Sequence, residues 1–311
     1  METSTQRRWL AALLIGACVS VATTTAAQTE SPVIKINEAA AKSDITITRL
    51  RGGVSTIMGS GGNITVLTGP EGKFLVDGGI AVSKNKIRDA LADLGDGAPR
   101  YLVNTHWHWD HSDGNAWLHG AGATIIGHSK TLEHLSQTVR VEDWDYTFQP
   151  LPPPGRPTVL VDSKKTMSFG TETILIKAYK TAHTDGDLSV YFKNADVLAT
   201  GDTFWNGVYP FIDYVEGGGI DGMIEAANAN VAMTTDTTII VPGHGPVADR
   251  KQLVAYRDML VAIRKNVADL KAKGLTVDQV IAAKPTSEFD ATWGQYVINP
   301  AFFTRLVYRG L

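Results

Sequence analysis

The sequence has 311 residues, of which 43% are hydrophobic and 20% are charged. This composition is typical of a globular protein and excludes a long disordered or low-complexity chain. The net charge of −3 excludes the strongly basic surface that nucleic acid or an anionic membrane would select. We therefore expect a small-molecule substrate as the partner and no nucleic acid.

Residues 1–27 have the layout of an export signal. Arg7 and Arg8 precede a short apolar run (residues 9–21), and small residues follow it. The run is shorter than the roughly 20 residues of a membrane-spanning helix, so we expect cleavage rather than a stable membrane span. The mature protein would be one domain, residues 28–311, in the periplasm or secreted. It would be one charge unit more negative than the full chain.

Two details leave the class of export signal open. The paired arginines weakly resemble a twin-arginine signal, and Cys18 resembles a lipoprotein acylation site that would give a lipid anchor. We favour the interpretation that Cys18 belongs to the discarded apolar run. The sequence has a single cysteine, so disulfides and thiolate metal ligands are both excluded from the mature domain.

The first half of the mature chain predicts strands and then a helix. Short alternating apolar runs at residues 45–47, 64–67 and 74–76, separated by glycine-rich turns, are typical of antiparallel strands. Residues 83–94 place apolar side chains on one helical stripe, and a buried strand follows at residues 101–103.

The second half repeats this order, which predicts the fold class. Two successions of strands and helices indicate an α+β fold, a four-layer αββα sandwich of two mixed β-sheets packed face to face with helices outside. We expect the last helix to close the domain. The predicted elements are strands at residues 174–176, 188–192, 197–199 and 238–241, and helices at residues 223–232 and 253–270.

The segment of residues 142–157 is different in character. It combines Trp144, Tyr146 and Phe148 with a proline-rich run, which resists regular structure and predicts a path across the surface. Two interpretations remain open for it, a loop that faces the substrate and a rigid connector between the halves.

A dense group of metal-ligand residue types follows the strand at residues 101–103. His106 and His108 are two apart on an extended segment, so their side chains point the same way and can grip one ion. A turn then offers Asp110 and His111 to a second ion. Imidazole and carboxylate groups are suitable ligands for Zn²⁺.

Three further candidate ligands follow later strands. His183, Asp202 and His244 each come after an apolar strand, in a turn that contains glycine. Glycine allows the backbone to approach a metal closely or to take an unusual angle. We expect these turns to converge with the first group on one edge of the sheets, since each residue alone would be unremarkable.

These residues together resemble the metallo-β-lactamase superfamily, whose signature is His-x-His-x-Asp-His followed by a later His, Asp and His. The resemblance covers nearly the whole mature chain, from Val76-Asp77-Gly78-Gly79 to Pro242-Gly243-His244-Gly245. It implies the metallo-β-lactamase fold and two Zn²⁺ ions. The implied ligands are His106, His108 and His183 for the first zinc, Asp110, His111 and His244 for the second, and Asp202 as the bridge.

The bridging aspartate narrows the implied function. Members that resemble glyoxalase II, lactonases and ribonuclease Z carry this aspartate, whereas the antibiotic-degrading members generally do not. Flavodiiron proteins have a glutamate where this chain has His108, which favours a hydrolytic zinc pair over an iron pair. The resemblance implies a hydrolase in which a metal-bridging hydroxide attacks a carbonyl of a lactone, β-lactam or thioester, with Asp110 as a catalytic residue that holds or passes the proton. Alternatives are a phosphodiesterase-type hydrolase and a flavin-free binding or accessory module without catalysis.

For the residues near the candidate ligands, the sequence leaves more than one role open. The resemblance suggests that Asp77 braces the site by hydrogen bonding, and a turn-capping aspartate is nearly as good an interpretation. Trp205 and Tyr209 follow Asp202 and are candidate substrate-binding residues, although aromatic residues near a core more often serve packing. The remaining histidines of the mature domain, His119, His128 and His134, are expected on the surface.

Overall fold

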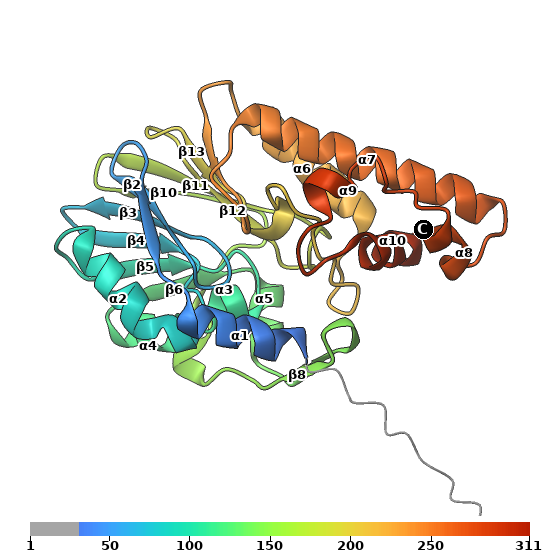
Figure 1. The fold of residues 1–311 in the computed structure, drawn as a ribbon. Coiled ribbons are helices and arrows are strands. Elements are labelled where there is room, and N and C mark those ends of the chain that lie inside the picture. The colour runs from blue at the N-terminus through green and yellow to red at the C-terminus, as the bar shows by residue number, and fades with distance from the viewer. Residues whose placement is uncertain (1–30) are drawn as a thin grey trace, which may run out of the picture. The chain divides into compact units, whose positions relative to one another are not determined.

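The structure is a computed structural model, and it describes residues 31–311. The predicted export signal and Cys18 lie outside the described residues. Residues 31–311 form one compact unit of mixed α/β structure (Figure 1). None of the helices described within this range has both the length and the apolar character needed to cross a bilayer.

The first half of the domain builds a seven-stranded sheet. Its strands follow the order β1-β2-β3-β4-β5-β6-β9, antiparallel from β1 to β4 and parallel from β4 onward. The strand bounds are Thr46–Arg49 (β1), Val54–Met58 (β2), Ile64–Gly69 (β3), Gly72–Val76 (β4), Pro99–Val103 (β5), Thr124–Gly127 (β6) and Val159–Leu160 (β9).

The second half builds a five-stranded sheet, β10-β11-β12-β13-β14, in which only β13 and β14 are parallel. A separate two-stranded sheet pairs β7 with β8. The bounds are Val139–Val141 (β7), Tyr146–Phe148 (β8), Lys164–Phe169 (β10), Glu172–Ala178 (β11), Leu188–Phe192 (β12), Val197–Ala199 (β13) and Ile239–Val241 (β14).

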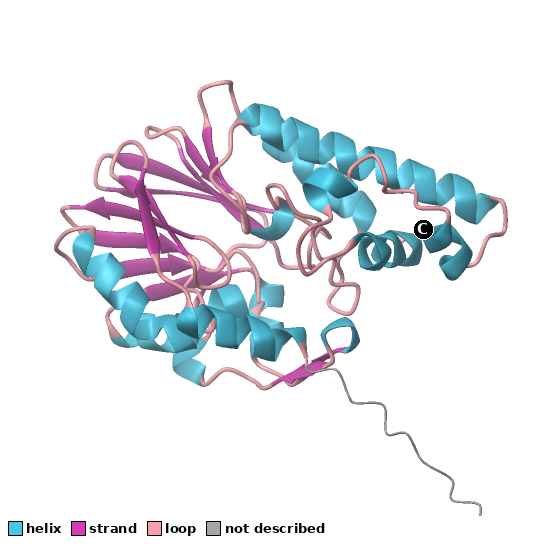
Figure 2. Cartoon of the chain, in the orientation of Figure 1, coloured by secondary structure: helices cyan, strands magenta, loops and turns pink. Residues whose placement is uncertain are grey.

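Helices cover the outer faces of the two large sheets (Figure 2). Helices α2 and α4 lie against the seven-stranded sheet, and α6 and α7 lie on the far side of the five-stranded sheet. The bounds are Pro32–Lys42 (α1), Lys84–Asp93 (α2), Trp109–Ser112 (α3), Asn115–Gly120 (α4), Ser129–Leu135 (α5), Ile220–Met233 (α6), Arg250–Ala272 (α7), Val277–Ala282 (α8), Asp290–Trp293 (α9) and Pro300–Arg309 (α10).

The alternation of apolar residues along the strands explains the layers. On β4, Phe74 and Val76 join the core between the two sheets, whereas Leu75 joins the core beneath α2. Successive side chains of a strand point to opposite faces, so one strand supplies two cores. On the other sheet, Ile174 and Val190 complete the core between the sheets. The predicted four-layer αββα sandwich is confirmed.

Two expectations about the chain path are wrong. The helix α7 does not close the domain, because α8, α9 and α10 follow it and α10 packs against α7. The segment of residues 142–157 does not lack regular structure, since it contains the strand β8 paired with β7. Its Trp144 is buried and packs against Phe211, so the segment is tied to the core.

Candidate metal centre

The candidate ligands lie where strands of both sheets end. The loop after β5 carries His106 and His108, and the first turn of the short helix α3 carries Asp110 and His111. His183 follows β11, and Asp202 lies in a short 3-10 turn directly after β13. His244 follows β14, the parallel neighbour of β13. The structure confirms that these turns converge at one place, as predicted.

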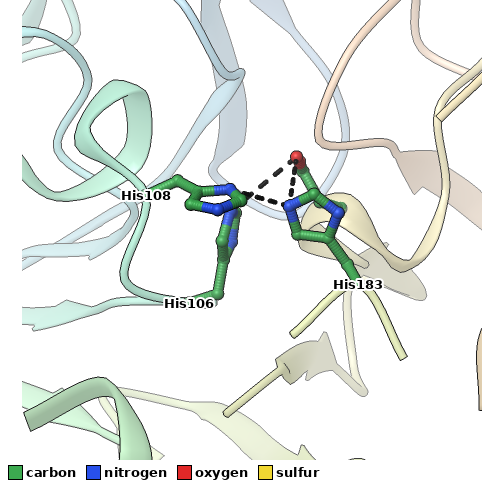
Figure 3. A group of neighbouring side chains, drawn as sticks. His106, His108 and His183 are labelled. Carbon is green, nitrogen blue, oxygen red and sulfur yellow. Dashed lines mark hydrogen bonds and ion pairs between the residues drawn. The ribbon is translucent and has the colours of Figure 1, made fainter. Parts of the chain in front are cut away.

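The first of two ligand groups consists of three histidines and Asp202. The rings of His106 and His108, from the loop between β5 and α3, approach the ring of His183, from the loop after β11 (Figure 3). Nε2 of His183 lies 2.8 Å from Nδ1 of His108. The Oδ2 atom of Asp202 lies 3.3 Å from Nε2 of His183 and 3.8 Å from Nε2 of His106.

The second group consists of Asp110, His111 and His244. Nε2 of His244 lies 3.3 Å from Oδ2 of Asp110 and 3.3 Å from Nε2 of His111. Asp202 connects the two groups, because its Oδ1 lies 3.1 Å from Nε2 of His111 and its Oδ2 lies 3.4 Å from Nε2 of His244. One carboxylate therefore contacts both groups.

The outer nitrogens of the histidine rings are held by hydrogen bonds. Nε2 of His108 lies 2.9 Å from Oδ2 of Asp213, and Nδ1 of His111 lies 2.8 Å from Oδ2 of Asp77. Nδ1 of His183 lies 2.8 Å from the carbonyl oxygen of Phe211. These oxygens accept hydrogen bonds from the ring N–H groups, which fixes the tautomer and leaves the other nitrogen free to bind a metal.

Asp77 also orients a second histidine through a threonine. Its carboxylate accepts hydrogen bonds from the backbone N–H of Thr105 at 2.7 Å and from the Thr105 hydroxyl at 2.8 Å. The same hydroxyl oxygen lies 3.0 Å from Nδ1 of His106. Asp77 has a positive φ of 66°, which is uncommon outside glycine, so its backbone is held in this conformation by the surrounding structure.

The inner atoms of the site fit a bound cation. Among residues 31–311, Nε2 of His106 is a buried side-chain atom without a hydrogen-bond partner. Buried polar atoms are nearly always paired, so an unpaired ring nitrogen at this place indicates that an ion or a water molecule binds there. Imidazoles and carboxylates in two buried groups are a donor set that suits Zn²⁺, and these groups could hold metal ions.

The charge state of the first group also suits a metal. Burial lowers the pKa of His183 to about 4, and burial together with the charge of His111 lowers the pKa of His106 well below its ordinary value. Burial alone would raise the pKa of Asp202, but the surrounding imidazoles outweigh it and hold that pKa well below its usual range. Neutral imidazoles and an ionised carboxylate are the forms that bind metals.

The pKa of His244 is raised, in contrast to the lowered pKa values of His106 and His183. Burial would lower its pKa, but the nearby carboxylates of Asp202 and Asp110 outweigh burial and raise the pKa of His244 to about 9. A metal ion would therefore displace a proton from this ring when it binds.

Two glycines leave room for the ligands. A Cβ atom on Gly243 would lie 1.9 Å from Oδ1 of Asp202, and one on Gly62 would lie 2.2 Å from Cε1 of His111. Both separations are far below van der Waals contact, so the site requires glycine at these positions.

The two aromatic candidates are placed differently. Trp205 lines the pocket above the ligands, and its ring centroid lies 4.2 Å from that of His244. Tyr209 is fully buried, stacks on Phe303 and donates a hydrogen bond to Asp290. It is not among the residues that line this pocket, so its expected place on the rim is corrected to a packing role.

The expectation that all three remaining histidines lie on the surface is also wrong. His119 is exposed, but His128 and His134 are buried. His134 lies between two carboxylates, with Nε2 2.7 Å from Asp185 and Nδ1 2.7 Å from Glu216. These two carboxylates stabilise the buried imidazole of His134. The position of His134 in a predicted helix did not indicate that it is buried.

Sequence reasoning missed three groups that hold the histidines in place, namely Asp213, Thr105 and the Phe211 carbonyl. Asp213 directly follows an apolar pair at residues 211–212, as the ligands follow apolar strands. An acidic residue after an apolar pair was therefore a visible signal. However, residues 211–213 form no strand, so Asp213 did not match the pattern of a ligand that follows a strand.

A family model described as the metallo-beta-lactamase superfamily matches residues 57–244, more than half of the chain. The chain belongs to the metallo-beta-lactamase superfamily. The matched range begins in β2 and ends at His244, so it contains every candidate ligand. The resemblance identified from the sequence is confirmed.

Solved structures of the same fold are similar to this superfamily member. The stereoselective inverting sec-alkylsulfatase Pisa1 from Pseudomonas sp. matches with a TM-score of 0.64 and 17% identity over 85% of this chain. This chain spans about half the length of that sulfatase (50%). A metallo-beta-lactamase from Pontibacter korlensis matches with a TM-score of 0.56 and 17% identity, over 70% of this chain and 99% of its own.

The BLEG-1 B3 metallo-beta-lactamase is similar at 21% identity and a TM-score of 0.55, over 70% of this chain and 99% of its own. At such identities the likeness establishes the fold shared within the superfamily. The reaction and the substrate have to be argued from the site itself.

Proposed function

We propose that this protein is an exported, zinc-dependent hydrolase that holds two zinc ions and cleaves a carbonyl substrate, namely a cyclic ester, a cyclic amide or a thioester. The observation that carries the proposal is the position of Asp202. Its carboxylate lies within 3.8 Å of ring nitrogens from both ligand groups, at His106, His183, His111 and His244. A carboxylate shared in this way suits a pair of cations rather than a single one.

Each ligand would have a defined task. His106, His108 and His183 would hold the first ion, Asp110, His111 and His244 the second, and Asp202 would bridge them. When bound, a zinc pair supplies Lewis acidity that polarises a carbonyl and lowers the pKa of water to about 7, so that a nucleophile exists at neutral pH.

The protein groups would manage protons and water. Asp110 lies at the edge of the pocket, with Oδ2 3.3 Å from His244, where it would hold or pass the proton that hydrolysis transfers. Trp205 and Phe211 wall the same pocket and are almost fully buried. They would exclude bulk water and so strengthen the electrostatic interactions within the site.

The pocket supports carbonyl substrates over phosphoryl substrates. Among the residues that line it there is no lysine or arginine. Phosphate diesters carry a negative charge that such side chains usually bind, so a phosphodiesterase role has less support. A module without catalysis also has less support, because both ligand groups are complete.

A substrate panel tests the proposal. Zinc-loaded protein is offered β-lactams, lactones, thioesters, phosphodiesters and alkyl sulfates, the last because of the likeness to a sec-alkylsulfatase. We expect turnover of at least one class with an acyl carbon. Exclusive turnover of phosphodiesters or sulfates would contradict the carbonyl assignment, and complete inactivity would favour the binding module.

Export stays part of the proposal. It is supported by the positive start, the short apolar run and the small residues of residues 1–27. Fractionation of the native host, with the mature N-terminus read by mass spectrometry, would test it. We expect the mature chain near residue 28 outside the cytoplasm, and a full-length cytoplasmic chain would contradict export.

A further inference from the structure

The pocket above the ligands is too small to contain a whole substrate. Its volume is about 30 Å³. That volume accommodates a water molecule or two. Ligand pockets usually measure roughly 300 Å³ or more. Only the reacting group of a substrate therefore fits beside the ligands, and the rest must lie at the mouth of the pocket.

The mouth carries two exposed apolar side chains. Tyr296 and Val297, which we call the lip, line the pocket from the segment between α9 and α10, with exposed fractions of 51% and 37%. Large apolar side chains exposed beside a pocket frequently mark a binding surface. Ile36 of α1 also lines the pocket and is partly buried.

The backbone of the lip segment belongs to no hydrogen-bonded helix or strand. Among the described residues, residues 295–298 form no backbone–backbone hydrogen bond. The segment is anchored instead by Ile298, which is fully buried, and by Trp293, whose carbonyl accepts a hydrogen bond from the Tyr209 backbone.

The remaining walls are apolar or aromatic. Trp109, Trp144, Trp205 and Phe211 surround the ligands. Trp109 is fixed by a 2.9 Å hydrogen bond from its indole to Asn37 of α1. Among the described residues that line the pocket there is no lysine or arginine, so a negative charge on the substrate, away from the reacting carbonyl and the ligands, would lose water without gaining such a partner.

We propose that the substrate has no negative charge away from the reacting carbonyl and carries an apolar alkyl or aryl group, and that Tyr296 and Val297 bind that group and set the specificity. This inference rests on the proposed hydrolase function and adds the substrate class to it. The lip residues do not take part in the reaction; they hold the substrate so that its carbonyl reaches the ligands.

A matched substrate series tests the inference. The series is built on the class that the panel identifies; for lactones, its members differ only in the length of the ring's alkyl chain, and one member ends in a carboxylate. Each buried methylene should raise kcat/KM about fourfold. The member with the carboxylate should be turned over at least tenfold less well than its neutral counterpart.

Three variants locate the effect. Tyr296→Ala and Val297→Ser should flatten the dependence on chain length, whereas Val261→Ser should keep it. Val261 is a matched control because it is 44% exposed, lies on α7 and does not line the pocket. An unchanged slope in both lip variants, or a wild-type preference for the carboxylate, would overturn the inference while leaving zinc-dependent hydrolysis intact.

A binding measurement separates this inference from the proposed function. Neutral 2-alkylcyclopentanones resemble lactones but cannot be hydrolysed, and their binding to metal-free protein can be followed by tryptophan fluorescence. We expect affinity to rise with chain length in the wild type and in Val261→Ser, and not in the lip variants. Equal dependence in all four proteins would overturn the role of the lip, whatever the panel of substrates shows.

Discussion

Asp213 and His108 are joined by a buried contact of 2.9 Å between Oδ2 and Nε2, although 105 residues separate them in the chain. The other oxygen of Asp213 accepts hydrogen bonds from the backbone N–H groups of Val215 and Glu216, which fixes the carboxylate. The contact leaves Nδ1 of His108 to face His183 and the ligand group.

The first prediction concerns this contact. Asp213→Asn replaces an anionic acceptor with a neutral one, so it should weaken zinc binding about 10- to 100-fold. Competition with a chromophoric chelator measures the affinity. The control is Asp221→Asn on α6, whose carboxylate pairs with Arg264 at the surface and which should bind zinc like the wild type. Equal affinities in both variants would contradict the role of Asp213.

The second prediction concerns Gly243. In Gly243→Ala the new Cβ would lie 1.9 Å from Oδ1 of Asp202, so the bridging carboxylate must move. Zinc content and activity should both fall at least about tenfold, as for loss of a group that orients a ligand. Gly120→Ala is the matched control, because no heavy atom lies within 4 Å of its new Cβ. Full zinc content in Gly243→Ala would show that the position tolerates a side chain.

The sequence predicted the four-layer fold and the convergence of the candidate ligands, but not every element around them. The candidate ligands lie in short turns after strands, and strand ends fix such turns locally, so His106 and Asp202 could be recognised as candidates from the sequence. Asp213 could not be assigned, because its role exists only after distant segments meet. The helices α8 and α9 were missed for a related reason: helices of 6 and 4 residues owe their stability to packing rather than to a long periodic pattern.

The third prediction is a pH dependence of stability at His134. Burial would lower its pKa, but the hydrogen bond to Asp185 and the charges of Glu216 and Asp185 outweigh burial, so its pKa in the folded protein is raised above 6.5. A raised pKa contributes stability that is complete below the unfolded pKa and is lost as the pH rises through the folded pKa.

Denaturant unfolding of zinc-loaded wild type and His134→Gln, from about pH 6 to about pH 9, measures this contribution. The wild type should be the more stable protein at the acidic end, and the difference should shrink as the pH increases. A difference that grows toward alkaline pH would contradict the sign.

The fourth prediction concerns metal removal. Ions that bind only the folded protein stabilise it by mass action, by about 2.7 kcal/mol per site when the free metal exceeds Kd a hundredfold. Chelation should therefore lower the Tm by several degrees, and zinc should restore it. His106→Ala should show a smaller response to zinc than the wild type, since it removes one ligand of the first group. A Tm insensitive to both chelator and zinc would contradict a metal site in the folded protein.

The most direct measurement is the zinc content of the purified protein together with its hydrolytic activity before and after chelation. We predict two zinc ions per chain in the wild type, loss of hydrolysis on chelation, recovery on zinc addition, and neither full zinc content nor recovery in Asp202→Ala. Full hydrolytic activity in protein shown to be free of metal would contradict the account.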